Sequence, residues 1–167
     1  MSLSIRRARP ADAEAIRDLH LASIGGLGGE RYSTEQVEAW AHDRDPASYP
    51  IDEPETTVFV AERGGSIVGF GWLSTDPDGE FEADVDAKIV AIYVHPAFAR
   101  QGIGTTIYEA LETRARELGL VSLGLWASLN AVPFYQANGF LTVREVDYEF
   151  DGSVEGTVLE MRKRLAD

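Results

Sequence analysis

Cysteine is absent from this 167-residue sequence, lysine is scarce, and no long apolar run occurs. The absence of cysteine excludes disulfide bonds, thiol nucleophiles and thiolate metal sites. The three histidines (His20, His42 and His95) are too scattered to form a metal-binding set, so we expect no metal cofactor. Because no run of eighteen apolar residues and no basic-then-apolar leader is present, we expect a cytoplasmic protein that does not enter a membrane.

Acidic residues outnumber basic ones, and the formal net charge is −13. This charge argues against broad binding to the phosphate backbone of DNA or RNA, so we expect no nucleic-acid partner. Of the 15 basic residues, only Lys88 and Lys163 are lysines. An acidic surface poor in lysine fits a high-salt cytoplasm, where ions screen self-repulsion, but a high-GC genome that favours arginine codons gives the same composition. The sequence leaves both explanations open.

The apolar pattern predicts one α/β domain over residues 1–167, built on a single central mixed sheet flanked by helices (an α+β arrangement). A first helix is expected from Pro10 and is predicted to end in the glycine-rich segment 25–29. Gly64-Gly65 predicts a hairpin turn between two strands. Strands are expected at residues 4–7, 57–62, 66–73, 89–94, 121–126, 140–150 and 154–164, and further helices at 33–40, 103–118 and 131–138.

The stretch from Lys88 to Gly119 organises the rest of the chain. A β-rich run ends at Val94, a short loop carries a basic residue, and a Gly-x-Gly sequence opens a helix. Backbone N–H groups are unpaired at such a helix start and the helix dipole adds positive charge, so the loop is a candidate phosphate site. The alternative is that Gly-x-Gly is only a turn. Ile107 replaces the third glycine of the dinucleotide fingerprint, and no P-loop Gly-Lys-Ser/Thr triplet is present. The helix has a predicted apolar stripe of Ile103, Ile107, Leu111, Ala115 and Leu118.

These residues resemble the acyl-CoA binding segment of the GNAT superfamily of N-acyltransferases. The family pattern is Tyr-Val-x-Pro followed by Arg/Gln-x-x-Gly-x-Gly/Ala, and this chain has Tyr93-Val94-His95-Pro96 and then Ala99-Arg100-Gln101-Gly102-Ile103-Gly104. Ala99 departs from the pattern, and the basic side chain comes one position later. A second segment, residues 127–140 (ASLNAVPFYQANGF), resembles the family segment that carries Asn, Phe-Tyr and Gly-Phe. The resemblance implies a GNAT fold that binds acetyl-CoA, and it covers essentially the whole chain.

The resemblance also implies site residues. For the cofactor they are Ile92, Tyr93, Val94, Arg100, Gln101, Gly102, Ile103, Gly104, Thr105, Asn130 and Phe134. Phe134 could instead belong to the core, and Asn130 could cap the short helix, bind the pantetheine arm, or do both. The family further implies that the strands ending near Val94 and Trp126 splay apart to form a slot for that arm.

The implied reaction is direct transfer of an acetyl group from acetyl-CoA to a primary amine in a ternary complex. A backbone N–H near Val94 would polarise the thioester carbonyl, and Tyr135 matches the family's acid, which protonates the departing thiolate. The alternative for Tyr135 is packing or a hydrogen bond to coenzyme A. No general base is identified, because Val90 and Ile92 stand where many family members have a carboxylate. The remaining candidates are Glu62, Asp84, Asp86 and a water chain.

The acceptor is predicted to be a small-molecule or peptide amine. In the family, the first two helices and their connection line the acceptor site. Tyr32, Gln36 and Trp40 therefore either contact substrate or simply pack. A homodimer is compatible with the sequence. A different class of function, a non-catalytic sensor of acyl-CoA, is the alternative to an enzyme.

Overall fold

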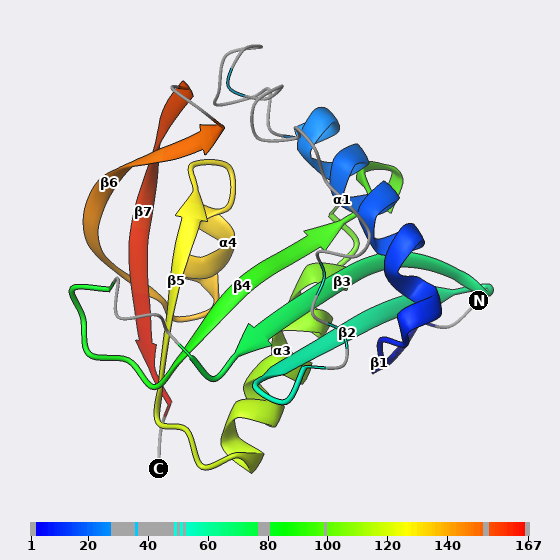
Figure 1. Cartoon of the computed structure of the whole chain (residues 1–167), viewed down its shortest axis with the longest axis horizontal. Helices are drawn as coiled ribbons and strands as arrows, with labels where there is room; N and C mark the ends of the chain where they lie inside the picture. Colours follow the sequence, from blue (N-terminus) through cyan, green and yellow to red (C-terminus); the bar gives the residue numbers. More distant parts are fainter. Residues whose placement is uncertain are drawn as a thin grey trace.

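The computed structural model describes residues 3–27, 36, 49, 51, 53–76, 81–98, 100–151 and 154–165, with only the backbone described for residues 24–27, 148–151 and 154–155. Within this part of the chain, seven strands form one mixed sheet in the order β1-β2-β3-β4-β5-β7-β6 (Figure 1). Neighbouring strands are antiparallel except β4 and β5, which are parallel. The strands are β1 (Leu3–Arg7), β2 (Thr56–Arg63), β3 (Ser66–Ser74), β4 (Ala87–Val94), β5 (Ser122–Ser128), β6 (Leu141–Asp151) and β7 (Val154–Arg164).

Helices cover both faces of the sheet. Helix α1 (Ala13–Leu27) follows a 3-10 turn at Pro10–Asp12 and crosses in front of β3 and β4 in Figure 1. Helix α3 (Ile103–Glu117) lies behind the same strands, and the short helix α4 (Val132–Ala137) follows β5. A second 3-10 turn, Pro96–Phe98, connects β4 to the loop before α3. The predicted fold class, a single mixed sheet flanked by helices, is therefore confirmed.

Two apolar cores, one on each face, hold the helices to the sheet. On the α1 face, Ile16 and Leu19 pack with Val60 and Phe70. On the α3 face, four of the five residues of the predicted stripe are buried: Ile103, Ile107, Leu111 and Ala115. The fifth, Leu118, is 42% exposed because the helix ends at Glu117 and Leu118 is its C-cap. Leu118 therefore continues the apolar stripe in the sequence but does not belong to the buried core.

Glycines on β3 let α3 approach the sheet closely. A Cβ atom at Gly69 would lie 2.8 Å from Ile107 Cδ1, and one at Gly71 would lie 2.5 Å from Ile107 Cγ2. Real Cβ atoms do not approach other carbons this closely, so any side chain here would push the helix away from the strand. The beginning of α3 is thus held near the first half of β3 and the end of β4.

An irregularity in β4 sets which way its last side chains point. Trp72 on β3 pairs with Ala91, but the next residue, Leu73, pairs with Ile89, so Val90 is an extra residue. Such a bulge reverses the alternation of side chains along the strand. Ile92 and Val94 therefore pack against the α3-side core, as Ile89 does, whereas Ala91 and Tyr93 belong to the α1 side.

The end of helix α1 agrees with the prediction, and the start of β4 does not. Helix α1 ends within the glycine-rich segment, at Leu27, after continuing through Gly25 and Gly26. A glycine in a helix costs only about 1 kcal/mol relative to alanine, which the packing of Ile16 and Leu19 offsets. Strand β4 begins at Ala87 rather than Ile89, because Ala87 and Lys88 pair with Leu123 and Gly124 on β5.

Glu160, a buried carboxylate on β7, holds the loop before β4 in place through hydrogen bonds. Glu160 is fully buried and accepts hydrogen bonds from the backbone N–H groups of Glu82 (3.0 Å) and Ala83 (2.9 Å) and from Arg144 Nε (2.8 Å). Burial alone raises the pKa of the Glu160 carboxyl, but these hydrogen bonds outweigh it and hold the pKa below the usual 4.5. In the same loop, Phe81 stacks on Trp126 with ring centres 4.8 Å apart.

We expect Glu160→Gln to lower the free energy of unfolding by about 2 kcal/mol at pH 7, because an amide cannot accept all three of these bonds. The folded-state pKa is depressed, so the stabilisation is present above the unfolded-state pKa and is lost as pH falls through the folded-state value. The difference in free energy of unfolding between wild type and variant should therefore become smaller below about pH 4. Urea unfolding at pH 7 and in acid measures this difference. Glu145→Gln, at an exposed position of β6, is the control and should cost less than about 0.5 kcal/mol.

Candidate active site

The parallel strands β4 and β5 pair only at their beginnings. Ala87, Lys88 and Ile89 pair with residues 123–125, and no pairing continues to Val94 or Ser128. The two strands diverge beyond that point, with the gap visible between their arrowheads in Figure 1. The predicted splay is confirmed, and it leaves backbone groups of β4 without a partner strand.

A cleft of about 530 Å³ occupies this opening. Every residue predicted to bind the cofactor lines it except Gln101, and Tyr135 lines it too. The side-chain oxygen of Gln101 instead accepts a hydrogen bond from Arg63 on β2. The described residues that line the cleft are Ser23, Ile92, Tyr93, Val94, Phe98, Arg100, Gly102, Ile103, Gly104, Thr105, Ser128, Asn130, Ala131, Pro133, Phe134 and Tyr135.

The N-terminus of α3 forms one end of the cleft. Its N-cap residue, Gly102, provides no side-chain cap, and the first helical hydrogen bond is donated by the N–H of Thr106 to the Gly102 carbonyl. The N–H groups of residues 103–105 consequently have no partner within the helix. Gly104 keeps the space in front of them open, because a Cβ there would lie 3.2 Å from Phe134 Cε1. Free amides, a helix dipole and open space together suit a phosphate group.

The loop that enters this helix has an unusual backbone. Arg100 has φ 64° and Gly102 has φ 81°, so both are left-handed. For glycine this conformation is easy, but for arginine it costs on the order of 1 kcal/mol. Arg100 lines the cleft and brings a full positive charge to the same end as the free amides. His95 stabilises the preceding turn, where its Nδ1 accepts the N–H of Ala97 at 3.1 Å, which supports a structural role.

Tyr135 lies on α4 and is 6% exposed, although it lines the cleft. Burial, together with the neighbouring phenol of Tyr93, raises the pKa of Tyr135 well above the usual 10. The phenol is therefore protonated throughout the neutral range and can serve only as a proton donor there. Its ring meets Phe134 and Phe140 edge-on, with ring centres 5.2 and 5.6 Å away.

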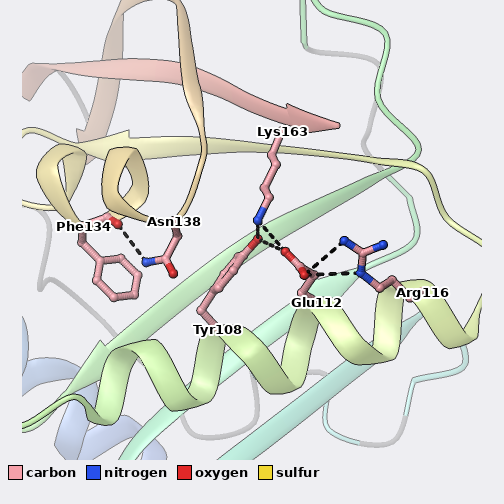
Figure 2. A network of polar contacts seen from close by, with 6 residues as sticks. All are labelled: Tyr108, Glu112, Arg116, Phe134, Asn138 and Lys163. Atoms are coloured by element: carbon pink, nitrogen blue, oxygen red, sulfur yellow. Dashed lines mark hydrogen bonds and ion pairs between the residues drawn. The ribbon is translucent and has the colours of Figure 1, made fainter. Parts of the chain in front are cut away.

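A polar network of side chains connects α3 to β7 (Figure 2). The Tyr108 hydroxyl donates to Glu112 Oε1 at 2.6 Å, and Lys163 Nζ donates to both the Tyr108 hydroxyl (2.9 Å) and Glu112 (2.6 Å). The ring of Tyr108 meets Phe140 edge-on at 5.8 Å. Phe140 also contacts Tyr135, so one ring lies between the network and the phenol that lines the cleft.

None of the carboxylates predicted as general base lines the cleft. Glu62 accepts a hydrogen bond from Arg6 Nε, and Asp86 accepts the N–H of Val121 at 2.9 Å, so both have structural partners. Asp84 is exposed. The N-cap of α4 is Ala131 and has no side-chain cap bond, so the capping role considered for Asn130 is not observed. Of the predicted acceptor residues, Gln36 is helical, whereas Tyr32 and Trp40 lie outside the described residues.

The sequence prediction missed five lining residues: Ser23, Phe98, Ser128, Ala131 and Pro133. Ala131 and Pro133 belong to the second motif and could have been included with Asn130. Ser23 carried a weaker signal, since it is a buried polar residue on the same helical face as Ile16. Ser128 lies in the same segment, residues 127–140, and carried the same signal, whereas the local sequence of Phe98 gives no indication that it lines the cleft.

No helix in the described part of the chain has the length and apolarity needed to cross a membrane. No group of three or more histidine, aspartate or glutamate side chains in this part of the chain is arranged to hold a metal ion.

Comparisons with known proteins agree on one class. Residues 16–140 match the model of the "Acetyltransferase (GNAT) family". The uncharacterized N-acetyltransferase YafP of Escherichia coli K12 is 25% identical, with 91% of this chain and 90% of the relative covered. An L-methionine sulfoximine/L-methionine sulfone acetyltransferase of Salmonella typhimurium LT2 is 30% identical, with 70% of this chain and 66% of the relative covered.

A solved structure is similar over almost the whole chain. The GCN5-related N-acetyltransferase (aminotransferase, class-II) from Rhodopseudomonas palustris has a TM-score of 0.83 at 28% identity, covering 99% of this chain and 97% of that one. A mixed sheet that opens beside a helix N-terminus, together with these relatives, defines an acyltransferase enzyme. The chain belongs to the GNAT acetyltransferase family.

Proposed function

We propose that this enzyme transfers the acetyl group of acetyl-CoA directly to a primary amine while both substrates are bound. The observation that carries the proposal is a single cleft lined by both the uncapped N-terminus of α3 and a buried, protonated phenol. In this arrangement the amides of residues 103–105 and Arg100 bind the diphosphate. Val94, Asn130 and Phe134 flank the pantetheine arm, which places the thioester near Tyr135.

The thioester carbonyl needs a hydrogen-bond donor as negative charge develops on its oxygen. The N–H of His95 donates to the Val68 carbonyl on β3 at 2.9 Å. Because successive N–H groups of a strand point to opposite sides, the N–H of Val94 is directed away from β3, toward the gap left by β5. This backbone group is the proposed donor, and the bulge in β4 does not affect it because the bulge precedes Ile92.

In the proposed step, the neutral amine forms a bond to the carbonyl carbon and the carbon–sulfur bond breaks. The Tyr135 hydroxyl gives its proton to the departing thiolate, and its phenolate then takes a proton back from solvent. Water or buffer takes the amine proton, because none of the described residues that line the cleft is a carboxylate. The names of two relatives, the methionine sulfoximine/sulfone acetyltransferase and an L-amino acid N-acyltransferase of Escherichia coli K12, support a small amine or amino acid as acceptor. Tyr32, Gln36 and Trp40 are proposed to line the acceptor side.

An amine panel with acetyl-CoA, read by release of free thiol, tests the proposal. We expect turnover with at least one amino acid, polyamine or peptide N-terminus, and initial-rate plots that intersect, as a ternary complex requires. Parallel plots, or an acetylated protein detected by mass spectrometry before the amine is added, would show a covalent intermediate and contradict direct transfer. Thiol release by no amine, with coenzyme A still bound, would contradict the proposed activity.

A further inference from the structure

Arg63 is the last residue of β2, and it lies at the end of the strands where the cleft opens. Strands β2 and β4 both run antiparallel to β3, so their final residues, Arg63 and Val94, come to the same edge. The chain turns back immediately through Gly64 and Gly65, which have φ 61° and 81°. The arginine side chain therefore projects from a tight hairpin toward the loop that follows β4.

Arg63 makes two contacts with that loop. Its Nη1 donates a hydrogen bond to the side-chain oxygen of Gln101 at 2.7 Å. Its guanidinium carbon lies 6.0 Å from the ring centre of Phe98, at the outer limit of a cation–π contact. Phe98 itself lines the cleft, and Gln101 is the residue between Arg100 and Gly102. Arg63 thus contacts the loop at Phe98 and at Gln101, which lie on either side of Arg100 in the sequence.

The backbone conformation of this loop explains why a contact that holds it in place is useful. Arg100 and Gly102, the neighbours of Gln101, are both left-handed, and for Arg100 this backbone conformation is strained. Gln101 is exposed and has no other described partner, so without Arg63 its side chain would be free in solvent. The direction in which residues 103–105 present their amides depends on this short connection, because α3 begins directly after it.

We propose that Arg63 is a positioning residue for the acyl donor: it fixes Gln101 and Phe98, and through them the loop whose amides receive the diphosphate. The inference rests on the proposed function, since it concerns the same cleft. It adds a contribution from the β2–β3 hairpin, outside both sequence motifs. It also gives Gln101 a role different from direct cofactor contact.

Arg63→Met removes the donor and the charge while keeping the length of the side chain. We expect the Kd of coenzyme A, measured by calorimetry, and the KM for acetyl-CoA each to rise about tenfold, the scale of one charge-assisted hydrogen bond. We expect kcat to stay within about twofold, because Tyr135 and Val94 are untouched. A purely structural defect would instead lower the active fraction and hence apparent kcat, with KM unchanged.

The effect of losing a positive charge must be separated from the effect of losing the contacts of Arg63. Loss of any positive charge disfavours an anionic ligand on a protein of net charge −13. Arg164→Met is the matched control: Arg164 is exposed and pairs with Ser122, at the opposite end of β5 from the cleft. We expect it to change the Kd of coenzyme A by less than about twofold, because screening weakens distant charges.

A double-mutant cycle with Gln101→Ala decides the mechanism. If Arg63 acts through Gln101, the combined variant binds coenzyme A no more weakly than Arg63→Met alone. Additive losses, or an Arg63→Met protein with wild-type affinity, overturn the inference while the proposed function stands. Failure of the wild type itself to bind coenzyme A removes the proposed function, and this inference with it.

Discussion

Replacing Gly104 by glutamate is expected to weaken coenzyme A binding at least about a hundredfold, which corresponds to about 2.7 kcal/mol. The new Cβ would lie 3.2 Å from Phe134 Cε1, tighter than most real contacts, so the side chain must project into the cleft. Its carboxylate would then occupy the space in front of the free amides of residues 103–105 and repel the diphosphate. Calorimetry with coenzyme A measures the loss directly.

Two variants separate the causes of this effect. Gly104→Ala adds the tight Cβ without the charge and should cost only a few-fold in affinity. Thr106→Glu adds the same charge two residues further along α3, at an exposed position that does not line the cleft, and should change affinity little. If Gly104→Glu binds coenzyme A like the wild type, the diphosphate does not lie at the N-terminus of α3.

The site was predictable where one short stretch of chain builds it. The strand, loop and helix start from Ile92 to Thr105 carry their geometry in local sequence, because glycines and a helix N-terminus act within a few residues. Gln101 shows the limit of this reasoning: its place in the motif suggested the cofactor, but a tertiary contact turns its side chain to Arg63. The sequence separation of 38 residues between the two leaves no local pattern to detect.

The fold was predictable in its elements and less so in its details. Every predicted strand is present, because alternating and continuous apolar runs bounded by turn residues are strong signals. The bulge at Val90 was not predicted, since the run from Ile89 to Val94 is apolar throughout and does not show which residues face which core. Helix α1 ends within the predicted glycine-rich segment, but the local sequence does not show which residue of that segment is its last, because packing along the whole helix decides this.

The general base could not be identified from the sequence, for a physical reason. Carboxylates are abundant in this chain, and their type alone does not show which one faces the cleft. The structure gives Glu62 and Asp86 structural partners in Arg6 and the Val121 amide. Among the residues that line the cleft, the groups able to move a proton are phenols and hydroxyls, namely Tyr93, Tyr135, Thr105, Ser23 and Ser128. This leaves Tyr135 as the acid to test.

The second large effect is expected for Tyr135→Phe, which should lower kcat at least about tenfold while the KM for acetyl-CoA stays within about twofold. The substitution removes only the hydroxyl, and the ring keeps its edge contacts with Phe134 and Phe140. Because burial holds the pKa of Tyr135 far above the neutral range, the phenol is the active, protonated form from pH 6 to 9. The shape of the pH–rate profile across this range should therefore be the same in wild type and variant.

Tyr108→Phe is the matched control, because Tyr108 is also buried and contacts the same Phe140 ring but does not line the cleft. Its hydroxyl binds Glu112 and Lys163 (Figure 2), so its loss should cost about 1–2 kcal/mol of stability and leave kcat within about twofold. A Tyr135→Phe enzyme with unchanged kcat would exclude Tyr135 as the acid. Equal losses of kcat in both variants would point instead to the packing around Phe140, since the two tyrosines share that contact and only Tyr135 of the two lines the cleft.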